Sequence, residues 1–106
     1  MRALLITIAV AALGETAAAD RELCAPGTRF RGQTLDLDVK AADIRDVFRL
    51  LADVSKTNLV VSDDVQGKIT LRLKRVPWDQ IACTVAAVQK LHITVQDSIL
   101  MVTRRK

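Results

Sequence analysis

The chain has 106 residues, which suits one small domain, and half of them are hydrophobic. Only 3% are aromatic, so the core is expected to be built from aliphatic side chains. The net charge of +4 is modest and is helped by a basic tail at residues 104–106. Nucleic-acid binding would need a basic stripe with interleaved aromatic side chains, so this composition argues against it.

Residues 1–19 have the pattern of a secretory signal peptide. Arg2 supplies the positive start, residues 3–13 are apolar apart from one threonine, and three alanines end the segment. Cleavage is therefore predicted between Ala19 and Asp20, which places the mature protein in the periplasm. The apolar run is shorter than the roughly 20 residues that span a bilayer. An uncleaved membrane anchor is the disfavoured alternative, and no transmembrane span is expected in the mature chain.

Residues 20–33 contain one proline and two glycines and read as an irregular N-terminal extension, with Phe30 as its only large apolar side chain. This extension also carries Cys24. In an exported protein, Cys24 and Cys83 most simply form a disulfide, which would hold the extension across the outside of the domain. Closing such a loop would contribute roughly 3–4 kcal/mol. Free or intermolecular thiols remain the alternatives.

Residues 34–39 alternate strictly and predict a half-buried strand. Asp36 and Asp38 lie on its polar face, which explains them without a catalytic or metal-binding role. A helix is predicted next, with Asp43 as its N-cap and an end near residues 55–56. Its apolar positions recur at spacings of three and four. They are Ile44, Val47, Phe48, Leu51 and Val54, with Leu50 beside them.

Residues 58–62 predict a short strand, and residues 68–74 alternate as a second strand. The turn between them closes at Gly67, so we expect an antiparallel hairpin. Asp63 and Asp64 resemble a calcium ligand pair, but no further carboxylates follow at the EF-hand spacing.

A second helix is predicted to start with Pro77 in its first helical position. Its expected buried face consists of Trp78, Ile81, Ala82, Val85 and Val88. Residues 92–96 and 99–103 then predict a hairpin. A zinc site from His92, Cys24 and Cys83 would need a fourth ligand and reduced thiols, so no metal or cofactor is expected.

The element order, β-α-β-β-α-β-β, predicts an α+β domain over residues 34–103. Four runs of this domain stand out: DIRDVFRLLADVS at 43–55, NLVVSDDV at 58–65, GKITLRLK at 67–74 and VPWDQ at 76–80. On these runs, residues 34–103 resemble the secretin and TonB short N-terminal domain, most closely the N0 domain of pilus secretins. The resemblance implies two helices between a two-stranded and a three-stranded sheet.

Two departures from the family accompany this resemblance. Lys56 stands where the family usually has glycine, at a cost of about 1 kcal/mol if that position needs a positive φ. The chain also stops at Lys106, where secretins continue into further modules and a barrel. We therefore expect a docking role and no channel.

The resemblance implies a free-standing periplasmic interaction module that assists a secretin, a type IV pilus or a type II secretion assembly at the outer membrane. Its expected partners are proteins: a secretin, an inner-membrane partner of one, or copies of itself in a ring. Residues 99–103 are expected to offer an exposed strand edge. The alternative is a TonB-dependent signalling module that contacts an anti-sigma regulator. One histidine and no phosphate loop argue against an enzyme or a small-molecule substrate.

Overall fold

The computed structural model describes residues 21–105, so the predicted signal peptide and its cleavage site at Ala19–Asp20 lie outside it. Two helices and six strands follow one another along the chain. They are β1 (Arg21–Glu22), β2 (Thr34–Asp43), α1 (Ile44–Ser55), β3 (Asn58–Val61), β4 (Lys68–Pro77), α2 (Trp78–Gln89), β5 (Leu91–Gln96) and β6 (Ile99–Arg104). The predicted α+β order is confirmed, with β1 added in the extension that was expected to be irregular.

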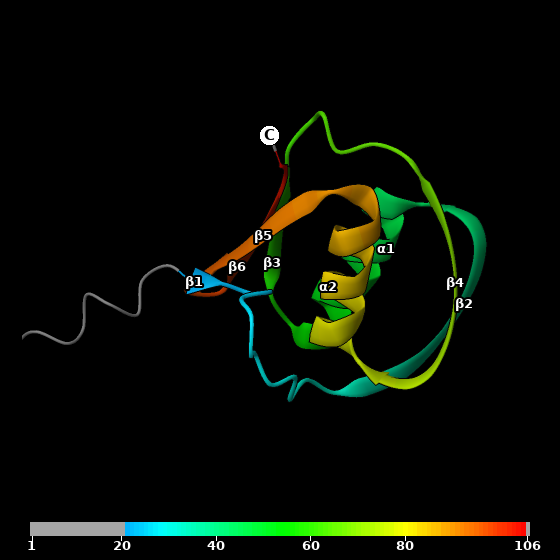
Figure 1. The fold of residues 1–106 in the computed structure, drawn as a ribbon, viewed down its shortest axis with the longest axis horizontal. Helices are drawn as coiled ribbons and strands as arrows, with labels where there is room; N and C mark the ends of the chain where they lie inside the picture. The colour runs from blue at the N-terminus through cyan, green and yellow to red at the C-terminus, as the bar shows by residue number, and fades with distance from the viewer. Residues whose placement is uncertain (1–20, 106) are drawn as a thin grey trace, which may run out of the picture.

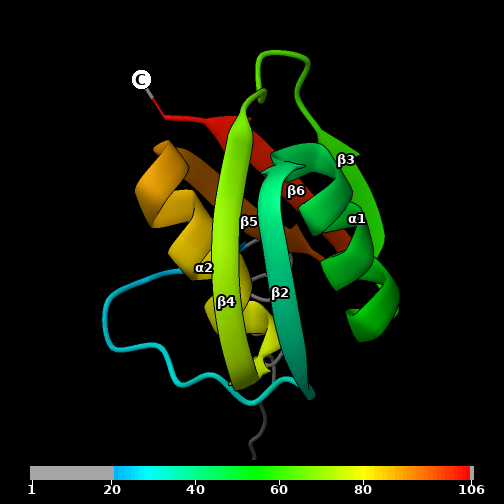
Figure 2. The ribbon, with the colours of Figure 1, turned by 90° about the vertical axis from the view of Figure 1, so that its right-hand side faces the viewer.

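The molecule has three layers, with both helices between two sheets (Figure 1). One sheet contains β2 and β4, and Figure 2 shows this pair lying across the two helices. The other sheet has the strand order β1-β5-β6-β3, so the expected three-stranded sheet gains β1 at one edge. The β5–β6 hairpin is confirmed, with Leu91 opposite Arg104 and Gln96 opposite Ile99.

The predicted hairpin between residues 58–62 and 68–74 is wrong, because its two strands belong to different sheets. β3 runs parallel to β6, whereas β4 pairs antiparallel with β2 from Thr34–Pro77 to Asp43–Lys68. The connecting residues cross the molecule, and Val65 is fully buried on the way. Arg104 fixes this crossing, because its guanidinium donates to the carbonyl oxygens of Asp64 and Gln66 at 3.0 and 3.1 Å.

The core is aliphatic apart from Phe48, as the composition predicted. Its fully buried side chains include Ile44, Phe48, Leu51, Val65, Ile81, Val85, Leu100 and Val102. The outer limits of both predicted helix faces were wrong: Leu50 is 40% exposed and Val88 is 62% exposed. Helix α2 is apolar on several sides, so its sequence did not define one inward face.

The helix ends follow local chemistry. The Asp43 side chain caps α1 by accepting from the Arg45 N–H at 2.9 Å, as predicted. Pro77 occupies the N-cap of α2, one position earlier than predicted. Lys56 and Lys90 end the two helices in the left-handed conformation, with φ of 59° and 60°. Lys56 thus adopts the conformation for which glycine is better suited. Neither helix described in residues 21–105 is long and apolar enough to cross a membrane.

Candidate interaction surfaces

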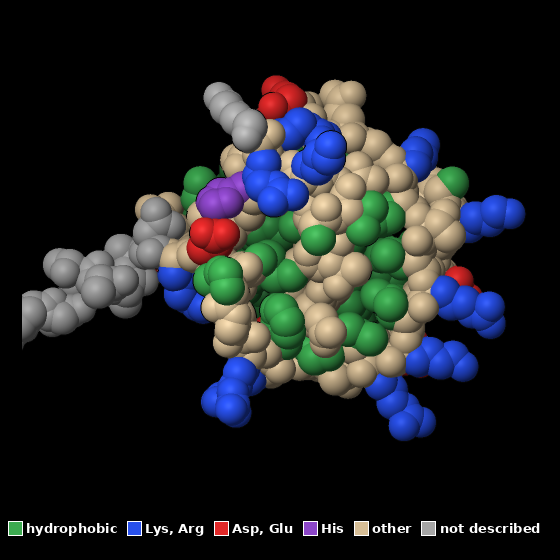
Figure 3. All heavy atoms as spheres, viewed as in Figure 1, with side chains coloured by type: hydrophobic (Ala, Val, Ile, Leu, Met, Phe, Trp, Pro, Cys, Tyr) green, Lys and Arg blue, Asp and Glu red, His purple; other side chains and the backbone are tan. Residues whose placement is uncertain are grey.

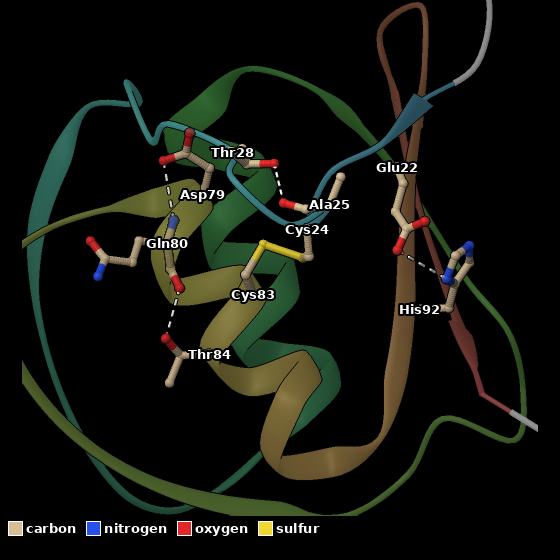
Figure 4. Close-up of a disulfide and its surroundings, with 9 residues drawn as sticks. All are labelled: Glu22, Cys24, Ala25, Thr28, Asp79, Gln80, Cys83, Thr84 and His92. Carbon is tan, nitrogen blue, oxygen red and sulfur yellow. Dashed lines mark hydrogen bonds and ion pairs between the residues drawn. A yellow bond between two sulfur atoms is a disulfide. The ribbon is translucent and has the colours of Figure 1, made fainter.

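The N-terminal extension, residues 21–33, is fastened to the outside of α2. A disulfide joins Cys24 to Cys83 across a Cα–Cα distance of 5.5 Å (Figure 4). Leu23, one residue before it, is 5% exposed and donates its N–H to the Ile93 carbonyl oxygen at 3.0 Å. Leu23 therefore anchors the extension more deeply than Phe30, which is only half-buried.

Asp79 holds the other end of the extension. Its carboxylate accepts from the backbone N–H groups of Arg31, Gly32 and its own neighbour Gln80, at 3.1–3.3 Å. Asp79 is 8% exposed, and it is the one charged residue that is buried within residues 21–105. The sequence suggested only that this carboxylate favours the first turn of a helix, because a contact with residues so far back along the chain leaves no periodic signal.

The three residues considered for a zinc site do not form one. Cys24 and Cys83 are bonded to each other, and His92 lies 3.9 Å from the Glu22 carboxylate (Figure 4). Residues 21–105 contain no group of three or more side chains placed to hold a metal ion. The Asp36 side-chain carboxylate, on the polar face of β2, accepts a hydrogen bond from the Arg75 backbone N–H at 2.8 Å.

Strand β6 is not the open edge that was expected at residues 99–103. It is hydrogen-bonded to β5 on one side and β3 on the other, so its backbone groups are used. The edge strands of this sheet are β1, which has two residues, and β3, which has four and a partner on one side only. A groove of about 550 Å³ runs between β3 and α1. Its walls are Arg45, Arg49, Ala52 and Asp53 from α1 and residues 57–59 and 61 from the β3 segment.

Helix α2 presents an uncharged outer face. Figure 3 shows hydrophobic side chains gathered on this side of the molecule, with basic side chains around the rim. The exposed positions of α2 are Gln80, Thr84, Ala87 and Val88. A hollow of about 240 Å³ beside them is lined by the disulfide and by Ala86, Ala87 and Leu91, among others.

Residues 37–92, which run from β2 to the start of β5, match the family model described as "GspD-like, N0 domain". The chain belongs to this N0 domain family. Its relatives include the fimbrial assembly protein PilQ of Pseudomonas aeruginosa, which is 42% identical over 69% of this chain. The type IV pilus biogenesis and competence protein PilQ of Neisseria gonorrhoeae is 40% identical over 77% of it. The chain spans about a tenth of the length of these relatives.

Solved structures show the same N0 fold. The N0 domain of the type II secretin from enterotoxigenic Escherichia coli superimposes with a TM-score of 0.62, over 68% of this chain and 95% of that one, at 16% identity. The type IV competence pilus secretin PilQ of V. cholerae has a TM-score of 0.58 and 35% identity, over 64% of this chain and 16% of that one.

The β3 edge and the N-terminal extension lie differently with respect to the residues that match the N0 family model. The β3 edge and its groove lie wholly within residues 37–92. The extension lies before these residues, and it reaches the N0 domain through Cys83 and Asp79. Secretin N0 domains are structural modules, which agrees with a site made of surfaces.

Proposed function

We propose that this N0 domain is a periplasmic protein–protein interaction module that assists the assembly of a secretin, a type IV pilus or a type II secretion system. The support is its relatedness to PilQ proteins, whose names describe fimbrial assembly and type IV pilus biogenesis. The predicted signal peptide supports export to the periplasm. The proposed partner is a secretin, an inner-membrane protein that serves one, or another copy of the domain.

The observation that carries the proposal is the open edge of β3. Asn58 and Ser62 donate their N–H groups toward β6, at 2.8 and 3.0 Å. Backbone groups alternate in direction along a strand, so the N–H groups of Leu59 and Val61 point away from the sheet. An extended segment of a partner can hydrogen-bond to this edge and so add a strand.

The groove beside β3 gives that partner strand a side-chain site. Leu59, Val61 and Ala52 supply apolar surface. Arg49 lies in the same wall with its side chain exposed, and Arg45 pairs with Asp63 at 3.5 Å. A partner strand with apolar residues facing the groove and an acidic residue near Arg49 fits this surface.

A crosslinking experiment tests the proposal. A photoreactive amino acid at Val60, which is 51% exposed on β3, should capture a secretin or its inner-membrane partner from the periplasm of the native host. The same group at Thr70, an exposed position on β4, serves as the control and should capture much less. Equal capture at both positions, or none at Val60 in cells that assemble pili, would contradict the proposal.

The variant Val61→Pro sharpens this test, because proline removes an N–H that points away from β6. Crosslinking from Val60 should fall about tenfold or more, while the thermal unfolding midpoint stays near that of the wild type. The matched variant Val61→Thr keeps the N–H and should keep the crosslink. Loss in both variants would assign the effect to the side chain and would count against strand addition.

A further inference from the structure

The extension and the N0 domain enclose a hollow of about 370 Å³ that neither forms alone. This volume lies near the lower end of the roughly 300–1,000 Å³ typical of ligand pockets. Arg21, Leu23, Thr28, Arg29 and Arg31 line it from the extension, and Thr57, Trp78, Asp79, Val95, Asp97 and Leu100 line it from the domain. We refer to it as the extension hollow.

The walls of the extension hollow are held at several points. The disulfide and the buried Leu23 fix the first part of the extension, and the Asp79 carboxylate fixes Arg31 and Gly32. Gly32 lies so close to Trp78 that a Cβ atom at this position would overlap the indole. The backbone N–H of Trp78 also donates to the Gln33 carbonyl oxygen at 3.0 Å. A site held in this way loses little entropy when it binds a ligand.

The charges of the extension hollow are unbalanced. Between residues 21 and 105, the guanidinium groups of Arg29 and Arg31 take part in no ion pair or hydrogen bond, and both side chains are exposed. The Asp79 carboxylate is directed at three backbone N–H groups and forms no ion pair with either guanidinium among the described residues. Arg21 adds a third positive charge, and Asp97 is the remaining acidic side chain of the lining.

The floor of the extension hollow is apolar. Leu23 and Leu100 are 5% and 0% exposed, and the half-buried Trp78 and Val95 extend this surface. Arginine and tryptophan are each enriched among the residues that contribute most to binding at protein interfaces. Guanidinium groups form paired hydrogen bonds with carboxylates. An inorganic anion would use the arginines and leave the accessible surface of Trp78 and Val95 in water, whereas an acidic side chain next to a large apolar one would use both.

We propose that the extension hollow binds an acidic peptide segment of a partner protein, with an Asp or Glu carboxylate on Arg29 and Arg31 and a neighbouring apolar side chain against Trp78. This contact goes beyond the proposed function, because the arginines come from the extension, outside the N0 match of residues 37–92. It also does not use the β3 edge, so either surface can fail its test while the other passes.

Trp78 reports on this binding directly, because it is the single tryptophan of the chain. The full chain is expressed with its own leader and purified from the periplasm. It is titrated with the peptide acetyl-Glu-Phe-Glu-Leu-Glu-amide while the indole fluorescence and the indole N–H resonance are followed. The expected result is a saturable change with a Kd of about 1 mM or tighter, which weakens as salt is added. No change of the Trp78 signals at several-fold higher peptide concentration would overturn the proposal.

Two comparisons make the result specific. The double variant Arg29→Gln/Arg31→Gln should bind the peptide about tenfold or more weakly. The control Arg72→Gln/Lys74→Gln also removes two positive charges, but from exposed positions on β4. It should bind the peptide as tightly as the wild type does. Equal weakening in both double variants would indicate attraction to net charge alone and would overturn the proposal.

Two further ligands complete the test. A peptide with Gln in place of every Glu should bind at least about tenfold more weakly than the acidic peptide. Inorganic phosphate should not displace the acidic peptide at matched ionic strength. Displacement by phosphate, or equal binding of the Gln peptide, would overturn the assignment to an acidic peptide segment.

Discussion

Helices α1 and α2 have the same length and the same type of C-cap, but they are held in the domain by different means. The outward side of α1 carries Asp46, Arg49 and Asp53, and its inward side buries Ile44, Phe48 and Leu51 completely. The single charged residue of α2 is Asp79, which is buried, and its outer face is uncharged. The extension covers part of that outer face through the disulfide.

The difference shows two ways to fix a helix in a small domain. The pattern of α1 alone defines which side enters the core, so α1 needs no help from other segments. Helix α2 is apolar on more than one side. Its contacts with residues 21–33, through Cys83 and Asp79, determine which part of its surface is covered. Both the extension hollow and the uncharged face therefore lie on the α2 side, and changes to the extension should affect α2 and β5 more than α1.

The largest expected effect comes from the disulfide. The double variant Cys24→Ser/Cys83→Ser should lower the free energy of unfolding by about 2–5 kcal/mol, because the unfolded chain loses a cross-link. Hydrogen exchange should accelerate first at the Leu23 amide, which bonds to β5, and least in α1. Urea unfolding with and without a reductant measures the loss. A wild type that responds to the reductant no more than the double variant would show that no cross-link had formed.

The next largest effect is the loss of stability when the carboxylate at the start of either helix is removed. Asp79→Ala leaves three backbone N–H groups without their acceptor and should cost about 2 kcal/mol. Asp43→Ala removes one N-cap bond and should cost about 1 kcal/mol. Chemical denaturation measures both. Asp79→Asn keeps one acceptor oxygen and should fall between the wild type and Asp79→Ala. Equal losses for Asp43→Ala and Asp79→Ala would mean that the extension adds nothing at α2.

The smallest effect concerns the feature that the helices share. Lys56→Gly and Lys90→Gly should each stabilise the protein by up to about 1 kcal/mol, because glycine adopts a positive φ without the Cβ penalty. Arg72→Gly, at an exposed position within β4, is the control and should destabilise by about 0.5–1 kcal/mol. Thermal unfolding of the three variants gives the comparison. A loss of stability in Lys56→Gly would show that the lysine side chain stabilises this helix end by another contact.

The sequence predicted the elements well and their partners poorly. Alternation in residues 34–39 and 68–74 identified β2 and β4, because alternation reports which face of a strand is buried. It does not report which strand lies alongside, so β4 was assigned to its neighbour in sequence, β3. The pairing found joins two strands of ten residues each, whereas β3 has four.

The candidate sites were harder to predict, since they depend on contacts between distant residues. The two cysteines suggested where the extension would attach. Leu23 is the most buried side chain there, yet a single leucine in a short irregular segment has no periodic signal. The open edge was assigned to β6 because strand order within a sheet cannot be read from a hairpin pattern. Because β3 pairs in parallel with β6, β6 lies inside the sheet and β3 forms one of its edges.

The parallel alignment of β3 with β6 also determines the order in which the sheet can close. The Asn58 side chain bonds to Ser98, a residue 40 positions later in the chain, and the backbone of β3 pairs with β6 from Asn58–Ile99 to Val61–Val102. A polypeptide that emerges N-terminus first therefore exposes β3 with both edges unpaired until β6 arrives. Helix α2 and β5 must emerge in between, so completion of this sheet is a late and comparatively slow step of folding.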